Sequence, residues 1–574
     1  MIDGRLHRIE RLAFNDSGAV LLWTMIFVTG LIVFPPLVYL IETSFTIERL
    51  GMPDMAGIDN FLSVLRLGGW KPWKNTILYA AGSSAVAIFL GLTSAWIVAR
   101  TNAWCRQISL ISAYLALAAP VMIKGIGWIL LLGPNKGLIN EWLRNSFGMT
   151  GVPIDLFTLG GMATLEGILW TPVVLLLCLP TLSAMDPALE EVAAMSGANR
   201  SKTFLRITLP LAAPGVLAVL FLTFIRSLES FEVPLLIGVP GGIYTFTTLI
   251  YQTIHSGFMP RYGEASAFAV LLIVVMLAPL FLYYRATRQS QKYATITGKG
   301  FRPSRMDLGG WRPVAGLYLL IIPISLLAPL AILLWTSFLP LYQSPHWSDL
   351  GRMSFANYID VLTQPLTLDG IRNGMIVAGI SATVVAAFTF LVAYIVVRRR
   401  EPVRWILDAI GSLPLVLPGV VLGTAILIQF LNLTFIPIYG TIWIMVLAFL
   451  IRYLPYGIRF CYSGIIAIDR QLEESARSCG AGLLTVLLRI VLPLALPAVT
   501  AIWIYVFLHS IRDLSLPVLL AGPRNKLIAV VILDLWNDGK IPQVGALSIL
   551  LAITVSLFGW ILMRLSSMKG TKSI

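Results

Sequence analysis

Charged residues are scarce in this chain. Of its 574 residues only 12% are Asp, Glu, Lys or Arg, and 57% are hydrophobic, whereas soluble domains carry roughly 25% charged residues. A soluble protein of this size would have too little polar surface to cover its core. The composition therefore excludes a large soluble fold and predicts a polytopic membrane protein.

Side chains that ligate metals or perform redox chemistry are also few. The four cysteines and four histidines are scattered, and no pair has the short spacing typical of a zinc site. They are Cys105, Cys178, Cys461, Cys479, His7, His255, His346 and His509. We interpret the cysteines as small packing residues and expect no metal site built by this chain alone.

A nucleotide-binding sequence of the form G-x(4)-G-K-[ST] is absent. No soluble segment is long enough for a nucleotide-binding domain either. The chain is therefore not expected to hydrolyse ATP, to supply catalytic residues or to bind a cofactor by itself. A cleavable signal peptide is not evident, because the first apolar run is long enough to span a membrane and no small-residue cleavage site follows it.

Long apolar runs are abundant instead. A helix needs about 20 mostly apolar residues to cross a bilayer, and twelve runs qualify. They cover about 19–42, 75–99, 107–132, 160–184, 209–238, 264–285, 313–339, 374–397, 405–432, 438–464, 492–520 and 543–564. The predicted fold is an all-α membrane protein with about 12 transmembrane helices. Several runs are interrupted by Pro or Gly, which the interior of a helix bundle tolerates.

The net charge of +14 would suggest a nucleic-acid partner in a soluble protein. Here, however, the basic residues lie in short segments between apolar runs. With the N-terminus inside, the cytoplasmic segments hold roughly twice as many Lys and Arg residues as the outer ones, which is the pattern of the positive-inside rule. We expect a multi-pass membrane protein with both termini cytoplasmic and no nucleic-acid partner.

The chain contains a long internal repeat. Residues 189–214 match residues 472–497 at 14 of 26 positions, at a constant offset of 283 residues. Further upstream, Arg100 corresponds to Arg398 at an offset of 298. Six runs in each half indicate a parallel duplication about a pseudo-two-fold axis along the membrane normal. We predict an N-terminal half at 1–287, a cytoplasmic linker at 288–310 and a C-terminal half at 311–574.

Each copy of the repeated segment has the pattern of a short capped helix in a cytoplasmic loop, at about 186–210 and 469–493. Asp186 is a typical N-cap, Pro187 suits the first helical position, and Gly197 ends the helix. The second copy repeats the pattern with Asp469, Glu473, Glu474, Ala476 and Gly480. Two such helices, related by a two-fold axis, predict the docking of a two-fold partner. The alternative is an ordinary cytoplasmic loop, which would drift between the copies as the outer loops do.

The pattern E-x-A-x(3)-G-x(12)-P resembles the EAA loop of ABC importer permeases. It is carried by Glu191, Ala193, Gly197 and Pro210, and again by Glu474, Ala476, Gly480 and Pro493. Val192 and Ser475 replace the middle alanine of the motif. The resemblance covers nearly the whole chain and implies the type I importer permease fold. In that family the loop forms the coupling helix, which sits in a groove of the ATPase subunit.

The resemblance implies three further expectations. The Glu, Ala and Gly residues of both copies would couple the chain to a separate ABC ATPase dimer, which binds ATP and Mg²⁺ on the cytoplasmic side. A periplasmic or extracellular solute-binding protein would deliver the substrate from outside. The protein would lie in the bacterial inner (plasma) membrane, with the lipid bilayer around it.

Fused permeases with two six-span halves are similar to ferric-iron importers. The sequences "ESFEVPLLIG" at 229–238 and "RDLSLPVLLAGP" at 512–523 favour that branch, while thiamine, phosphonate and polyamine permeases are close alternatives. The lack of clustered His or Cys does not count against iron, because Fe³⁺ is a hard ion that prefers oxygen ligands. A different class, an ion-coupled secondary transporter, also uses parallel six-span halves, but the paired docking loops favour the importer.

Four charged residues at equivalent positions of two spans are candidate pathway or gate residues: Arg226, Glu229, Arg512 and Asp513. A charge at the bilayer centre costs about 2.5–3.5 kcal/mol on insertion scales, so each needs a partner or contact with water. Glu229 and Arg512 occupy the same repeat position with opposite sign, which predicts a pair between the halves beside the transport path. The alternative is that these side chains lie among the lipid headgroups without a specific role.

Overall fold

The computed structural model describes residues 3–47, 54–66, 69–185, 192–193, 195–197, 199–257, 259–290, 306–398 and 403–570. Its internal contacts divide the chain into two compact units. Unit 1 comprises Met1–Gly57, Pro365–Val531 and Leu557–Ile574, and unit 2 comprises Ile58–Gln364 and Ile532–Ser556. Nearly all regular structure in both units is helical, which agrees with the predicted all-α fold.

The elements of unit 1 are α1 (Asp3–Ser44), β1 (Thr46–Ile47), β2 (Met55–Ala56), α16 (Pro365–Arg398), α17 (Arg404–Ser412), η6 (Leu413–Val416), α18 (Gly419–Asn432), α19 (Ile442–Ile466), α20 (Arg470–Ser478), α21 (Leu483–Val486), η7 (Leu487–Val491), α22 (Leu492–Arg512) and α23 (Pro517–Leu520). The strands β1 and β2 form one short antiparallel pair.

The elements of unit 2 are α2 (Asp59–Arg66), α3 (Lys71–Arg100), α4 (Arg106–Ala118), α5 (Val121–Leu132), α6 (Leu138–Phe147), α7 (Leu159–Ser183), α9 (Arg200–Thr203), η1 (Phe204–Thr208), α10 (Leu209–Glu229), η2 (Pro234–Gly238), α11 (Phe246–His255), α12 (Tyr262–Ser290), η4 (Gly309–Trp311), α13 (Arg312–Leu319), α14 (Ile321–Ser337), η5 (Trp347–Arg352) and α15 (Ala356–Thr363). Two more helices, α24 (Ile528–Asn537) and α25 (Ile541–Gly570), contain residues of both units.

Among the described residues, ten helices are long and apolar enough to cross a membrane, or up to twelve if each of two bent helix pairs is one span. The ten helices coincide with ten of the predicted apolar runs. The other two runs, 107–132 and 405–432, fall on the bent pairs. The predicted set of apolar segments is therefore present, but two of them are not straight.

The bends have the same local cause in both pairs. The helix direction changes by 112° between α4 and α5, and by 107° between the segment 404–416 and α18. Pro120 and Pro418 stand immediately after the residues where the backbone becomes extended. Proline offers no N–H group and disfavours a helical conformation of the residue before it, so the helix stops there. At the first bend, Lys124 Nζ donates to the carbonyl of Ala116 at 3.2 Å, and this bond replaces part of the interrupted helical bonding.

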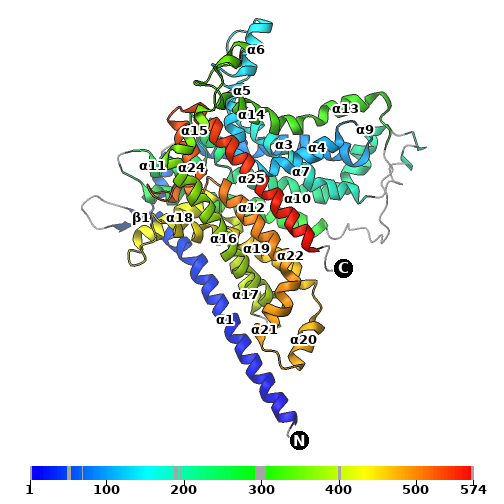
Figure 1. Cartoon of the computed structure of the whole chain (residues 1–574), viewed down its shortest axis with the longest axis vertical. Coiled ribbons are helices and arrows are strands. Elements are labelled where there is room, and N and C mark those ends of the chain that lie inside the picture. Colours follow the sequence, from blue (N-terminus) through cyan, green and yellow to red (C-terminus); the bar gives the residue numbers. More distant parts are fainter. Residues whose placement is uncertain are drawn as a thin grey trace. The chain divides into compact units, whose positions relative to one another are not determined.

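Each compact unit combines helices from both halves of the sequence. In unit 1, α1 runs along α17 and α18 (Figure 1). Leu22 and Met25 of α1 are buried in one cluster with Val392, Leu407 and Ile458 of the second half. In unit 2, a helix of the second half packs against helices of the first half: α14 contacts α4 and α5. The compact units cut across the predicted boundaries at 287 and 311, which stay a prediction, and most of the predicted linker, 291–305, lies outside the described residues.

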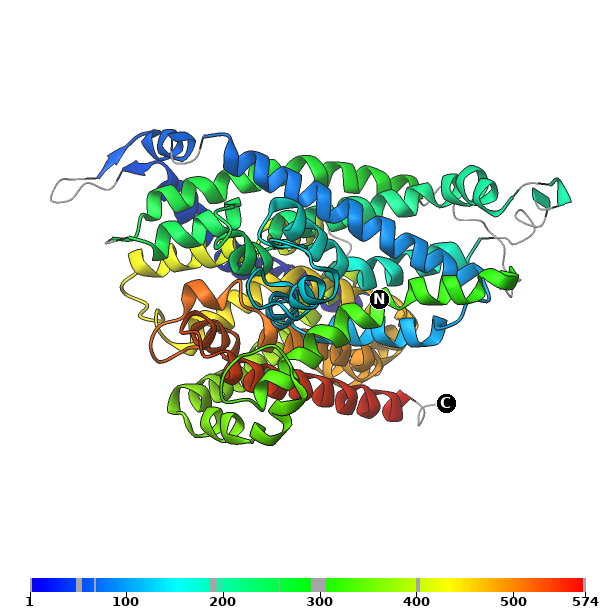
Figure 2. The ribbon, with the colours of Figure 1, turned by 90° about the horizontal axis from the view of Figure 1, so that it is seen from above.

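Both halves contain a close helix contact at a glycine, but in the second half the glycine lies on the other helix of the pair. α3, the long blue helix in Figure 2, packs closely against α7 in unit 2. A Cβ atom on Gly91 of α3 would lie 2.5 Å from Cβ of Val174, and one on Gly457 of α19 would lie 2.5 Å from the side chain of Thr389 on α16. In the repeat, Gly91 corresponds to Thr389 and Val174 to Gly457. The same close contact is therefore made twice, and van der Waals contact of this kind stabilises helix pairs in lipid.

The entry from each repeated loop into the membrane is also duplicated. A π-helical turn precedes α10 and another precedes α22, namely η1 and η7. Pro210 and Pro493 stand in the first turn of the α-helix that follows each turn. Because proline cannot donate a hydrogen bond, a wider turn at this point accommodates the missing N–H group. The sequence offset of 283 is thus matched by equal local structure.

Candidate functional site

The second copy of the repeated segment forms the predicted capped helix, α20. The Asp469 side chain accepts a hydrogen bond from the Gln471 backbone N–H at 3.0 Å and caps the first turn. At the other end Gly480 has φ +83°. Its N–H donates to Arg477 O at 2.9 Å, and the Ala481 N–H donates to Ala476 O at 3.0 Å. This is the paired bonding of a Schellman ending, which requires the left-handed backbone that glycine adopts without strain.

The first copy is described only in part. Glu191 lies outside the described residues. Ala193 is buried, and Gly197 has φ +76°, which is the conformation found at its repeat partner Gly480. Both glycines therefore have the same left-handed backbone conformation.

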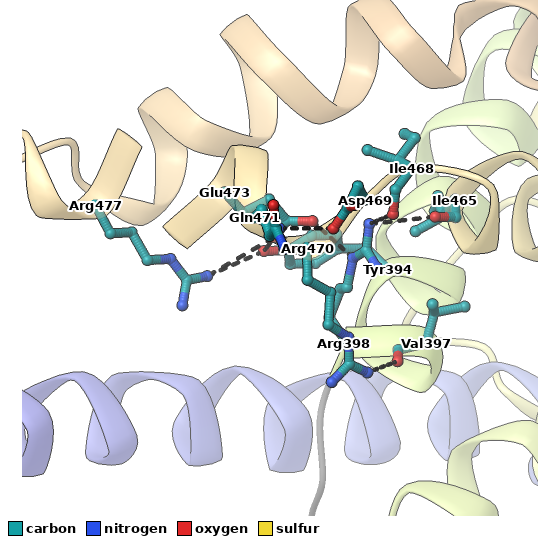
Figure 3. A network of polar contacts seen from close by, with 10 residues as sticks. All are labelled: Tyr394, Val397, Arg398, Ile465, Ile468, Asp469, Arg470, Gln471, Glu473 and Arg477. Carbon is teal, nitrogen blue, oxygen red and sulfur yellow. Dashed lines mark hydrogen bonds and ion pairs between the residues drawn. The ribbon is translucent and has the colours of Figure 1, made fainter. Parts of the chain in front are cut away.

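Two adjacent glutamates on α20 face in different directions. Glu473 is only 4% exposed. Its Oε1 lies 2.6 Å from Nε of Arg398, and its Oε2 accepts a hydrogen bond from the Tyr394 hydroxyl at 3.1 Å (Figure 3). Glu474 is exposed. Of the two carboxylates, Glu473 therefore binds α20 to its own chain, and Glu474 is presented outward.

Arg398 ties three elements together from the last turn of α16. Besides its ion pair with Glu473, it donates to the carbonyls of Ile465 at 3.2 Å and Ile468 at 2.8 Å, at the end of α19 and in the short connection to α20 (Figure 3). In the first half Arg100 is fully buried and donates to Met185 O at 2.7 Å. Met185 corresponds to Ile468 in the repeat. We call the contacts of Glu473 with Arg398 and with Tyr394 the clasp.

Exposed apolar side chains occur on both copies of the repeated segment, and one of them, Leu472, lies beside the outward glutamate. Leu472 on α20 is 49% exposed, and in the first copy Val192 and Met195 are 56% and 82% exposed. Ala476 is half-buried. Apolar side chains next to an exposed carboxylate are typical of a surface that another protein covers.

The charged helix ends in the two halves have equal geometry but different chemistry. In α10, Arg226 Nη1 lies 2.7 Å from Glu229 Oε2, three residues further on. At the repeat-equivalent positions of α22, His509 Nε2 lies 2.6 Å from Arg512 Nη2. An arginine only donates, so this contact is a hydrogen bond in the tautomer that has its proton on Nδ1, and Nδ1 faces Tyr505 O at 2.8 Å. Glu229 and Arg512 belong to different compact units, and the pair between them stays a prediction.

Asp513 has a partner that was not predicted for it. Its Oδ2 lies 3.5 Å from Arg452 Nη1, and its Oδ1 accepts from the Ser515 hydroxyl at 2.9 Å. Arg452 also donates to Ser515 Oγ at 3.0 Å. The guanidinium passes the start of α18 where a Cβ on Gly419 would lie only 1.9 Å from it. A larger residue at this position would displace the Arg452 guanidinium and the Ser515 hydroxyl.

Aromatic rings surround this polar cluster between α19 and α22. Tyr505 stacks on His509 at 4.0 Å between ring centroids, and Tyr453 lies edge-on to Tyr505 at 6.0 Å. Tyr456 is 5.6 Å from Tyr505. The cluster combines hydroxyl, imidazole, guanidinium and carboxylate groups from the middle of α19 and the end of α22. Polar groups gathered at membrane depth are typical of a substrate or ion path.

A polar cavity lies in unit 2. It has a volume of about 590 Å³ and lies between α6 and η5. Its lining includes Lys136, Glu141, Arg144, His346 and Asp349. Below it, the Tyr342 hydroxyl donates to Leu130 O and Lys136 O, both at 2.9 Å. Burial and the neighbouring Glu141 raise the pKa of this hydroxyl to about 12, so it remains a donor at neutral pH.

Most of these side-chain contacts could not be predicted from the sequence. The clasp had a signal, because Arg100 and Arg398 correspond in the repeat. The pair Arg226–Glu229 also had one, since charges three residues apart on a helix are neighbours. No sequence feature pointed to the Arg452–Asp513 pair. No group of three or more His, Cys, Asp or Glu residues that could hold a metal ion occurs in the described part of the chain.

These features define a multi-pass membrane permease built from two repeated halves. Residues 87–292 and 379–568 match the family described as binding-protein-dependent transport system inner membrane component. The matched segments cover more than half of the chain, which therefore belongs to this family and is an ABC importer permease. Membership decides between the two classes that the sequence left open, in favour of the importer and against the ion-coupled secondary transporter.

Several curated relatives are similar over much of their length. The chain is 27% identical over 498 residues to the ferric transport system permease protein FbpB of Actinobacillus pleuropneumoniae, covering 85% of this chain and 70% of the relative. It is 28% identical over 447 residues to the putative ferric transport system permease protein FbpB 1 of Haemophilus influenzae, covering 77% and 68%. A probable ABC transporter permease protein, y4fN of Sinorhizobium fredii, is 26% identical, and the match covers 92% of both chains.

Among solved structures, a chain of a bacterial ABC transporter involved in the import of the acidic polysaccharide alginate is similar. The match covers 51% of this chain and all of that chain, with 22% sequence identity and a TM-score of 0.39.

Proposed function

We propose that this permease forms the translocation path of an ATP-driven importer of ferric iron, which a solute-binding protein delivers from outside. The observation that carries the proposal is the duplicated coupling element, with its buried anchor and its outward carboxylate. The ferric transport names of two relatives support iron as the substrate. Permeation of a polyamine, thiamine or a phosphonate through the same path is the alternative.

The coupling elements are proposed to dock an ABC ATPase dimer, which binds ATP and Mg²⁺. Glu191, Ala193 and Gly197 would contact one ATPase subunit, and Glu474, Ala476 and Gly480 the other. The exposure of Glu474 and of the apolar residues near it supports this role. Glu473 supports it differently, because a helix anchored by a buried ion pair can transmit a displacement to α16 as a rigid body.

Orientation follows from the requirement that one ATPase dimer contacts both elements. If each bent pair crosses the membrane once, four spans precede the first element and ten precede the second, so both lie on the same side. If neither pair crossed, three and eight spans would precede them, and they would lie on opposite sides. If only the second pair crossed, three and nine spans would precede the elements, again on the same side, so the second pair must cross. Because the two pairs are equivalent in the repeat, we infer that the first crosses too, which gives twelve crossings and both termini in the cytoplasm, in agreement with the distribution of Lys and Arg.

The proposed path runs past the charged helix ends. Arg226, Glu229, Arg512 and Asp513 are the candidate gate residues, and the tyrosines near His509 add hydroxyl groups. Carboxylate and hydroxyl oxygens suit a hard cation such as Fe³⁺, while the neighbouring arginines would keep the cation from binding too tightly. On the outer side, the cavity between α6 and η5 is proposed to contact the solute-binding protein, whose own residues hold the iron.

The test is reconstitution of the permease with its ATPase and candidate solute-binding proteins in lipid vesicles. Binding protein loaded with Fe³⁺ should stimulate ATP hydrolysis and iron uptake, and apo-protein should not. Failure of the ATPase to co-purify with the permease would refute the docking role. Normal co-purification, with stimulation by a polyamine, thiamine or phosphonate binding protein instead, would refute only the assignment of iron.

A further inference from the structure

A basic cavity lies beside the clasp in unit 1. Its volume is about 510 Å³, within the range of small-molecule sites. It is formed by the ends of α16 and α19, the start of α17 and the first residue of α20. Its lining consists of Val396, Val397, Arg398, Arg404, Trp405, Asp408, Arg459, Tyr462, Ile466, Ile468 and Arg470.

Among the described residues that line this cavity, the charged ones are four arginines and one aspartate. Arg398 is committed to Glu473 and to two carbonyls, as described above. Arg404, Arg459 and Arg470 are exposed. Arg459 lies 3.4 Å from Asp408 but keeps 58% of its side chain exposed, and Arg470 uses one N–H group for Val397 O at 3.1 Å. A guanidinium has five N–H donors, so Arg459 and Arg470 retain donors for an anion, while Arg404 adds positive charge and donates to Val396 O at 3.4 Å.

The cavity joins a polar end to an apolar wall. Val396, Val397 and Ile466 belong to the ends of two helices long enough to span a membrane. Arg398 and Arg470 lie at and beyond those ends, and Arg459 lies two turns before the end of α19. Trp405 is 66% exposed and Tyr462 half-buried, and such aromatic side chains prefer the level of the lipid headgroups. A free phosphate ion would satisfy the arginines but would leave the apolar wall and the aromatic rings uncovered.

We propose that this cavity binds the phosphate group of an anionic phospholipid, with Arg404, Arg459 and Arg470 on the headgroup and an acyl chain along the apolar wall. Basic pockets between spanning helices on the cytoplasmic side bind such headgroups. The assignment to the cytoplasmic leaflet rests on the proposed function, because it depends on α20 facing the ATPase.

The site has a consequence for coupling. Arg398 belongs both to the cavity wall and to the clasp, Ile468 of the cavity wall accepts a hydrogen bond from it, and Arg470 is the first residue of α20. A bound headgroup would neutralise the repulsion among the cavity arginines and hold the start of α20 against α16. Anionic lipid should therefore favour the docked position of the coupling helix.

The experiment measures lipid binding directly, by native mass spectrometry of the purified full-length permease titrated with phosphatidylglycerol. Each arginine-to-glutamine change, at Arg404, Arg459 or Arg470, should weaken binding by roughly fivefold, and the triple variant by on the order of a hundredfold. Asp408→Asn should tighten binding by roughly twofold to fivefold, because it removes the negative charge. Arg489→Gln is the matched control, since Arg489 is an exposed arginine of the same unit outside the cavity, and it should leave binding unchanged.

Two further arms separate the sources of the phosphate group. Phosphatidylcholine should bind weakly to all variants, and inorganic phosphate at equal concentration should not displace phosphatidylglycerol. Equal binding of phosphatidylglycerol by the native protein and the triple variant, or weaker binding by Asp408→Asn, would overturn the proposal. Displacement by inorganic phosphate would overturn the lipid as its source. Since binding is read without ATP hydrolysis, these results are independent of whether the transport function holds.

Discussion

The clasp between α16 and α20 gives the sharpest test of how the coupling element is held. Arg398 and Glu473 have 9% and 6% of their side chains exposed, and their charged atoms are 2.6 Å apart. Removing one partner of such a buried pair typically costs about 3–5 kcal/mol, because the other charge remains buried without compensation. Arg398→Gln and Glu473→Gln should each destabilise the attachment of α20 by this order of magnitude.

The two single changes should not be equal. Arg398 also donates to Ile465 O and Ile468 O, and its loss leaves both carbonyls with one hydrogen bond fewer. Each lost hydrogen bond from a charged donor costs about 1.5–3 kcal/mol. Arg398→Gln should therefore be more damaging than Glu473→Gln. Arg398→Lys should recover part of the loss, since it keeps the charge but lacks the planar fork.

The assay has two readouts on the same purified complexes. Protease cleavage within residues 470–480 reports detachment of α20, and ATP hydrolysis with and without transport reports uncoupling. The double variant should lose less than the sum of the single losses, with a coupling energy of about 1–3 kcal/mol. Glu474→Gln is the control, because this exposed neighbour should weaken ATPase binding without increasing cleavage. Strict additivity of the single effects, or cleavage of Glu474→Gln equal to that of Glu473→Gln, would refute the reasoning.

Further changes test the remaining features. Gly480→Val should introduce about 1–2 kcal/mol of backbone strain, because a β-branched residue is unfavourable at φ +83°. The variant should uncouple ATP hydrolysis from transport while the protein stays in the membrane. Normal uptake would count against the coupling role. A single cysteine at Gly351, where a Cβ would meet nothing within 4 Å, should react with impermeant reagents only from outside; labelling from the cytoplasm would contradict the twelve-crossing topology. Glu229→Gln and Arg512→Gln should each reduce substrate-stimulated ATP hydrolysis, and the double variant should recover part of the loss if the two charges meet; additive losses would mean that they do not. Gly457→Val should reduce thermal stability of the purified protein by several degrees, because its side chain would overlap Thr389, and an unchanged melting temperature would argue against that close contact.

Local features of the sequence predicted local structure well. The apolar runs coincide with membrane-spanning helices because length and hydrophobicity alone decide whether a helix can cross lipid. The capped helix α20 was predictable because Asp469 and Gly480 act within one helical turn of themselves. The repeat carried the same information twice, which is why the glycines at 197 and 480 could be assigned equal roles.

Features that depend on distant parts of the chain were not predictable. The prolines at 120 and 418 indicated interruptions but not the size of the bends. Glu473 and Glu474 are neighbours in the sequence, and only the position of Arg398, 75 residues earlier, decides which of them faces inward. Likewise Asp513 pairs with Arg452 of another helix, for which periodicity and charge patterning contain no signal.

The placement of α1 among helices of the second half affects the order in which the protein is made. About 360 residues separate Ser44, the end of α1, from Arg404, the start of α17 against which it packs. At ordinary translation rates the ribosome needs on the order of 20 to 70 seconds to synthesise that length. During this time Leu22 and Met25, which are later buried, must face lipid or the insertion machinery. In an N-terminal half produced alone, α1 would never be covered by its partner helices from the second half. The two halves are therefore duplicated in sequence but do not mature as separate modules.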